Sequence, residues 1–96
     1  MMGATDLLIQ FMAAAREDAR IGVTHIGVYV SLLTLWHIRN RETPLPVFSH
    51  EAMPYCKLLG PATYHRTIRQ LAEYGYIRYV PSYNHLLGSL VWVEVE

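Results

Sequence analysis

Cysteines, net charge and phosphate-binding glycine loops are scarce or missing in this chain of 96 residues. The single cysteine, Cys56, excludes an internal disulfide and fits a reducing cytoplasm. The five histidines show no i, i+4 pairing and have no acidic companion at metal-ligand spacing. The sequence also has no glycine-rich phosphate loop and no pattern that places a nucleophile beside a base. We therefore expect no cofactor, no metal and no enzymatic activity.

Signals for a membrane or for secretion are also weak. The apolar stretch 26–38 is too short to cross a bilayer, and it contains Ser31, Thr34 and His37. The first residues lack the basic start of a signal peptide and carry Asp6 and Gln10 instead. We expect a cytoplasmic protein with no membrane partner, and no small-molecule ligand is evident from the sequence.

Apolar residues, by contrast, are abundant and make up 52% of the chain. The length suits one domain near the small end of those that fold alone, so part of this excess is available for burial between subunits. We expect residues 1–22 to form an N-terminal helix that is a candidate dimerisation element, and residues 23–96 to form the main domain. Thr5 or Asp6 is the expected cap of that helix, which should reach about Ala19. Its expected apolar stripe consists of Leu8, Phe11, Met12 and Ala15.

A second helix is expected from about His25 to Asn40, with Gly22 interrupting the first helix and Thr24 as the new cap. It is apolar on nearly all sides and is interrupted only by small residues, Gly27, Ser31 and Thr34. A helix of this kind lies centrally, with another element packed on its outer face. The first helix, from the same chain or from a partner subunit, is the candidate for that position.

The segment 43–48 is expected to be extended, because Pro44 and Pro46 exclude a helix and restrict a strand to the edge of a sheet. Ser49 is the expected cap of a short helix that continues to about Leu58. Pro54 falls inside this helix, where it should kink the helix or shift its start.

The segment 60–80 carries the clearest local signals. Gly60 suits an N-cap, Pro61 suits the first helical position, and Gly75 suits the left-handed residue that ends a helix. At 100° per residue, one face of this helix carries the apolar Tyr64, Ile68 and Leu71. The opposite face and its flanks carry Ala62, Thr63, His65, Arg66, Arg69, Gln70 and Glu73. Small residues permit close approach and Arg or Gln can reach base edges, so this face suits the major groove of DNA.

Two strands are expected after this helix, from Tyr76 to Pro81 and from Ser89 to Val95, with a turn-rich loop between them. Together they form a hairpin over residues 76–95. The expected fold class is therefore α+β, mostly helical with a small β-hairpin.

The segment 60–77 resembles the recognition helix and wing entry of winged helix-turn-helix transcription regulators, through the spacing Gly60-x-x-Thr63-Tyr64-x-Arg66-x-Ile68-x-x-Leu71-x-x-x-Gly75-Tyr76-Ile77. From about Phe11 onward, the chain is similar to small winged-helix proteins associated with bacterial mobile elements. That similarity is carried by Thr24-His25-Ile26, Leu35-Trp36, Ala62-Thr63-Tyr64-His65, Gly75-Tyr76-Ile77-Arg78-Tyr79-x-Pro81-Ser82-Tyr83 and Gly88-Ser89-Leu90-Val91. The resemblance implies a winged helix with an extra N-terminal helix, and DNA binding without catalysis.

In such a fold, helix 61–74 would lie in the major groove and hairpin 76–95 would form the wing. Thr63 and Arg66 are the expected direct base contacts, and Arg69 is expected to meet a phosphate. Gln70 belongs to the residue type that reads adenine. Ala62 and His65 complete the candidate reading face.

Further candidates lie outside this helix. Ser49 and Lys57 stand at the two ends of the preceding helix, where contacts to the DNA backbone usually arise. Tyr83, Asn84 and His85 are the candidates at the wing tip. The pair Leu86-Leu87 departs from the resemblance, because the wing loops of DNA-binding members usually carry Arg or Lys.

Basic residues gather around this candidate interface even though the net charge is zero. Residues 57–85 contain one acidic residue, Glu73, against the basic residues Lys57, Arg66, Arg69 and Arg78. The positive charge that attracts nucleic acid is therefore placed next to the candidate recognition helix.

The function expected from these observations is sequence-specific binding of double-stranded DNA, by a transcription regulator or an accessory factor of a mobile element. A homodimer through the N-terminal helix would address half-sites about 34 Å apart, or a multiple of that distance. The alternative is a non-catalytic winged-helix module for protein–protein interaction or dimerisation, which the zero net charge, the apolar excess and Leu86-Leu87 favour. An ordinary solvated helix face is the plain alternative for the polar side of helix 61–74.

Overall fold

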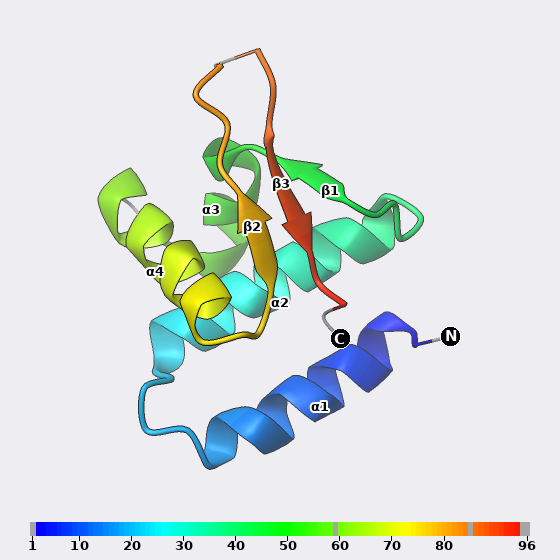
Figure 1. Ribbon diagram of the computed structural model, residues 1–96, viewed down its shortest axis with the longest axis vertical. Helices are drawn as coiled ribbons and strands as arrows, with labels where there is room; N and C mark the ends of the chain where they lie inside the picture. Colours follow the sequence, from blue (N-terminus) through cyan, green and yellow to red (C-terminus); the bar gives the residue numbers. More distant parts are fainter. Residues whose placement is uncertain (1, 59, 85, 95–96) are drawn as a thin grey trace.

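The computed structural model describes residues 2–58, 60–84 and 86–94. The fold is α+β, with four helices and a three-stranded antiparallel sheet in the described ranges. In chain order the elements are α1 (Ala4–Arg16), α2 (Val23–Ile38), β1 (Leu45–Val47), α3 (Ser49–Cys56), α4 (Pro61–Glu73), β2 (Arg78–Val80) and β3 (Ser89–Trp92). Figure 1 shows α2 crossing the molecule, with α1 on one side and the other helices and the sheet on the opposite side.

The helix α2 is central, as its uniform apolar character predicted. Val28 and Leu32 are completely buried, and Trp36 is nearly so. The helix packs against α1, α3 and α4. The indole Nε1 of Trp36 donates to Thr43 Oγ1 (3.1 Å), so the polar edge of this large side chain also has a partner.

The first helix packs on α2 of the same chain. Its buried stripe consists of Leu7, Phe11 and Ala15, whereas Met12, expected in that stripe, is 40% exposed. The Phe11 ring stacks on Tyr29 with 3.8 Å between centroids and meets the Tyr76 ring edge-on at 5.1 Å. The apolar stripe of α1 is therefore buried against other elements of the same chain.

Three of the expected helix caps are wrong, and the three corrections share one mechanism. The N-caps of α1, α2 and α3 are Gly3, Gly22 and Phe48, where the sequence suggested Thr5 or Asp6, Thr24 and Ser49. In each helix the side chain three residues on accepts a hydrogen bond from the N-cap amide. The pairs are Gly3 N with Asp6 Oδ2 (3.1 Å), Gly22 N with His25 Nδ1 (3.0 Å) and Phe48 N with Glu51 Oε1 (2.9 Å).

Helix ends also differ from expectation. The first helix ends at Arg16 and the second at Ile38, each before the expected boundary. Helix α3 begins at Ser49 with Pro54 inside it, so the proline does not shift its start. It ends at Cys56, because Lys57 adopts a left-handed conformation with φ 61°.

The helix α4 begins and ends as predicted. Gly60 is the N-cap and Pro61 occupies the first turn. At the other end, Gly75 has φ +88°, its amide bonds to Ala72 O (3.1 Å), and the Tyr76 amide bonds to Leu71 O (2.9 Å). This pair of bonds is the Schellman arrangement, which satisfies carbonyls that the helix end would leave unpaired.

The sheet has the order β1-β3-β2, with β1 at one edge as its prolines predicted. Leu45 faces Val91 across β1 and β3, and Tyr79 faces Val91 across β2 and β3. The chain passes very close to β1 at Gly88, where an added Cβ would lie 2.9 Å from the Val47 amide nitrogen. None of the helices in the described ranges is both long and apolar enough to span a bilayer.

Candidate nucleic-acid interface

The apolar face of α4 fixes this helix to the rest of the domain. Tyr64, Ile68 and Leu71 are buried as predicted, and the last two are completely inaccessible. Burial raises the pKa of the Tyr64 hydroxyl well above its ordinary value. Thr67 is also buried, and its hydroxyl donates to the Thr63 carbonyl oxygen (2.7 Å). The orientation of α4 about its own axis is therefore set by packing, and the opposite face must point outward.

That outward face is open and basic. Ala62, Arg66 and Arg69 are exposed, and Thr63 and His65 are half-buried. Among residues 2–58, 60–84 and 86–94, no carboxylate lies within 4.0 Å of the guanidinium group of Arg66 or Arg69. Both guanidinium groups can therefore meet an external anion or a base edge without breaking an internal ion pair.

A groove of about 320 Å³ separates α4 from the hairpin. From the helix it is lined by His65 and Arg69, and from the hairpin side by Tyr79, Pro81, Ser82, Tyr83 and Ser89. The Ser89 hydroxyl oxygen accepts from the Ser82 amide (3.2 Å), which leaves its proton free to donate. The groove is lined by the Arg69 guanidinium and by side-chain hydroxyl groups. A phosphate oxygen can accept hydrogen bonds from both kinds of donor.

The side chain of Gln70 is hydrogen-bonded to a residue of α2. His25 Nε2 lies 2.8 Å from Gln70 Oε1, and both side chains are half-buried. The other ring nitrogen of His25 is the acceptor of the Gly22 amide described above. The contact connects the start of α2 with the outward side of α4, so one of the two polar atoms of Gln70 is already occupied.

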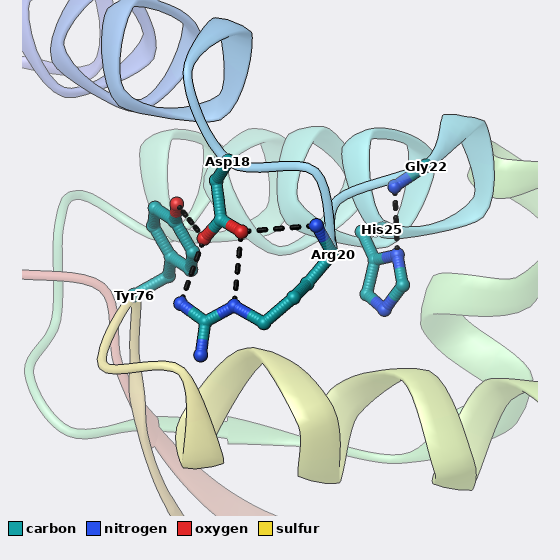
Figure 2. A network of polar contacts seen from close by, with 5 residues as sticks. All are labelled: Asp18, Arg20, Gly22, His25 and Tyr76. Atoms are coloured by element: carbon teal, nitrogen blue, oxygen red, sulfur yellow. Dashed lines mark hydrogen bonds and ion pairs between the residues drawn. The ribbon is translucent and has the colours of Figure 1, made fainter.

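The loop between α1 and α2 is tied to the end of α4 by a polar cluster (Figure 2). Arg20 donates from Nε and Nη2 to the Asp18 carboxylate (2.9 and 2.8 Å), and the Tyr76 hydroxyl donates to Asp18 Oδ2 (2.7 Å). These bonds, with Arg20 as the larger cause, hold the pKa of the Asp18 carboxyl well below its usual value. The Arg20 guanidinium also lies 4.2 Å from the centre of the Tyr74 ring. Because Tyr74 and Tyr76 flank Gly75, the cluster fixes the end of α4.

The candidates on the preceding helix are placed at its two ends, as expected. Ser49 is the first residue of α3 and is half-buried, and Lys57 follows the last turn and is exposed. Beneath this start, the Arg39 guanidinium is paired with the Glu51 carboxylate. Glu51 is thus engaged both by Arg39 and by the Phe48 amide, which gives the start of α3 a fixed geometry.

The hairpin tip presents apolar side chains and a structural asparagine. Tyr83 is 97% exposed, and Leu86 and Leu87 are also exposed. The Asn84 side-chain oxygen accepts a hydrogen bond from the Leu86 amide (2.9 Å), so this oxygen is engaged within the hairpin tip. His85, the third candidate at the tip, lies outside the described residues.

Two features of this region have no signal in the sequence pattern. His25 faces Gln70 although 45 residues separate them, and Ser82 and Ser89 meet across the hairpin at the groove. The position of His25 three residues after the N-cap Gly22 is a local signal for its bond to the Gly22 amide, but not for its bond to Gln70. Its second partner depends on how α2 crosses α4, which is a tertiary property.

In the described part of the chain, no group of three or more histidine, cysteine, aspartate and glutamate side chains is arranged to hold a metal ion. The chain matches no protein-family model, no curated protein and no solved structure. Inferences about its function therefore rest on its own residues and geometry.

Proposed function

We propose that this protein is a winged helix that binds double-stranded DNA sequence-specifically, with α4 in the major groove and hairpin 76–95 as the wing. The element order and the sheet order β1-β3-β2 are compatible with that fold. The observation that carries the proposal is the outward face of α4. It exposes Arg66 and Arg69, neither of which pairs with a carboxylate of the described residues, on a helix whose orientation is fixed by a buried opposite face.

The groove beside α4 supports a defined track for the DNA backbone. With α4 in the major groove, one strand would pass between the helix and the hairpin, where Arg69 and the Ser89 hydroxyl offer donors to phosphate oxygens. Lys57 and Ser49 would meet the backbone on the other side of α4. In this proposal Thr63 and Arg66 face the base edges, and the hairpin supplies position more than sequence information.

The biological role that fits is a transcription regulator or an accessory factor of a mobile element, acting in the cytoplasm without chemistry of its own. A homodimer would place two α4 helices on half-sites about 34 Å apart or a multiple of that distance. Because the buried stripe of α1 is used within the protomer, such a dimer would use the outer side of that helix. That side carries Ile9 and Met12, which are 63% and 40% exposed.

A titration by electrophoretic mobility shift against random duplex DNA, at two salt concentrations, tests the proposal. We expect binding that weakens with salt, with a log–log slope near −0.9 for each phosphate contact. Absence of binding at both salt concentrations would contradict it. A selection of bound duplexes from a random pool then gives the operator, and a symmetric site would report the dimer.

A protein-interaction module is the second candidate function, because of one specific observation. Tyr83, Leu86 and Leu87 are three exposed apolar side chains at the hairpin tip, and Ile9 and Met12 are exposed on α1. In that case the protein would form a tight oligomer or complex and fail to bind duplex DNA at any salt concentration. Sedimentation of the protein alone and with duplex separates the two functions.

A further inference from the structure

The hydrogen bonds of His25 determine which of its ring nitrogens carries the proton. Its Nδ1 lies 3.0 Å from the Gly22 amide nitrogen, which can only donate, so Nδ1 must be the acceptor. The neutral ring then carries its proton on Nε2. Nε2 must meet an acceptor, and the atom 2.8 Å away is Gln70 Oε1. Figure 2 shows His25 above α4, with its Nδ1 directed at the Gly22 amide.

This chain of bonds also sets the direction of the Gln70 amide. Because Oε1 is held by His25, the NH₂ group is the free end of the side chain. A glutamine recognises adenine by using both ends at once, accepting from the adenine N6 amino group and donating to N7. The bond from His25 uses one lone pair of Oε1 and fixes the direction of that oxygen, so a two-ended contact with adenine would compete with this bond. The adenine reading that its residue type suggests is therefore disfavoured by the fold.

We propose that His25 is a positioning residue that makes Gln70 a hydrogen-bond donor toward the major groove. Gln70 then favours guanine, whose edge presents only acceptors (O6 and N7), or thymine O4. It disfavours adenine, whose N7 acceptor lies beside an amino group that also donates. The inference rests on the proposed DNA-binding function and names the base class that one position of α4 reads. The residue that sets this preference belongs to α2 and makes no contact with DNA itself.

Replacement of His25 can reverse the preference without removing the helix cap. In His25→Glu, one carboxylate oxygen can accept from Gly22, as Glu51 accepts from Phe48 in α3. The other oxygen then faces Gln70 and attracts its NH₂ group, which turns the amide oxygen outward. In His25→Gln, the amide oxygen can accept from Gly22 while the NH₂ group donates to Gln70, as the imidazole does. The first variant reverses the polarity of Gln70 and the second preserves it.

Selection of duplexes from a random pool with the full-length wild type and these variants tests the proposal. We expect one position of the wild-type site to prefer guanine or thymine by about threefold to tenfold, the discrimination of one hydrogen bond. Gln70→Ala should lose the preference at that position, His25→Gln should keep it, and His25→Glu should shift it to adenine or cytosine, whose amino groups donate. An unchanged preference in His25→Glu would overturn the proposal. A uniform loss of affinity in Gln70→Ala, with no change at any base position, would also overturn it by assigning Gln70 to a phosphate.

A measurement on the free protein separates this inference from the proposed function. The ¹⁵N chemical shifts of the neutral His25 ring distinguish a proton on Nε2 from one on Nδ1, and we expect it on Nε2. A proton on Nδ1 would overturn the positioning role whether or not DNA binds. Failure of the wild type to bind any duplex would overturn the proposed function, and the base preference with it. Binding with no position sensitive to Gln70 would overturn this inference alone.

Discussion

Replacement of Arg66 by alanine should weaken DNA binding while leaving the fold intact. The Arg66 side chain is exposed, and within the described ranges its guanidinium has no carboxylate within 4.0 Å. Alanine is also a slightly better helix former than arginine. Substitutions at such surface positions usually change the free energy of unfolding by less than about 0.5 kcal/mol. The melting temperature of Arg66→Ala should therefore stay within a few degrees of the wild type.

The binding loss should be much larger than this change in stability. A base contact by an arginine is worth about 1–3 kcal/mol of discrimination, which corresponds to roughly a 5- to 150-fold increase in Kd for the preferred site. Because the contact reads a base, discrimination between sites should fall as well. If Arg66 met only a phosphate, affinity would fall equally for all sequences and the salt slope would drop by about 0.9.

Ile68→Ala is the matched control, on the same helix but facing the core. Ile68 is completely buried, so its truncation should cost about 2–5 kcal/mol of stability and lower the melting temperature by roughly 10 °C or more. Thermal unfolding followed by circular dichroism and DNA binding followed by fluorescence anisotropy measure the two effects. If Arg66→Ala lowers the melting temperature as Ile68→Ala does, or leaves the affinity unchanged, the assignment of Arg66 to the DNA interface is wrong.

Three further predictions concern the scaffold. The folded-state pKa of Asp18 lies below its usual 3.8, so Asp18 stabilises the fold above that pH and loses this contribution as pH falls towards the folded value. The urea midpoint of Asp18→Asn should therefore fall less than that of the wild type between about pH 5 and pH 2. An equal fall in the two proteins would contradict the stabilising role of the Asp18 cluster. Gly88→Ala should lower the urea midpoint, because the new Cβ would lie 2.9 Å from the Val47 amide nitrogen, whereas the control Gly60→Ala meets nothing within 4 Å. Equal urea midpoints for the two variants would refute the close approach at Gly88. Gly75→Ala should cost about 1–2 kcal/mol in urea unfolding, for the positive φ alone, and a neutral effect would contradict the left-handed helix end.

The parts of the fold that follow from local chemistry were predictable from the sequence. Gly60, Pro61 and Gly75 each have a conformational role that hardly depends on the rest of the chain, so both ends of α4 were correctly predicted. The spacing of Tyr64, Ile68 and Leu71 identified the buried face for the same reason. The two prolines likewise placed β1 at a sheet edge.

The other helix starts were missed because residue preference and side-chain reach point to different positions. Thr24 and Ser49 are residue types that often cap helices, but Gly22 and Phe48 are the caps, and side chains three residues further on bind their amides. The apolar stripe of α1 was displaced for a related reason. Leu7 and Leu8 are adjacent and equally apolar, and only the position of α2 decides which of them is buried.

The sequence predicts which residues lie on the exposed face of α4, but it does not predict the hydrogen bonds that these residues make with other elements. The exposure of Ala62, Arg66 and Arg69 follows from helical periodicity once the buried face is known. The bond between Gln70 and His25 connects residues on two helices, and only their packing brings the side chains together. The contribution of the wing stays a prediction, as do the homodimer and the regulatory role.

Amide chemical-shift mapping of the ¹⁵N-labelled protein, titrated with a duplex chosen by selection from a random pool, tests the central claim most directly. The proposal predicts that the largest shift changes occur at Ala62, Thr63, Arg66 and Arg69, with smaller changes at Ser82 and Ser89 and none along α1. Changes confined to α1, or no changes on the exposed face of α4 at saturating duplex, would contradict the account.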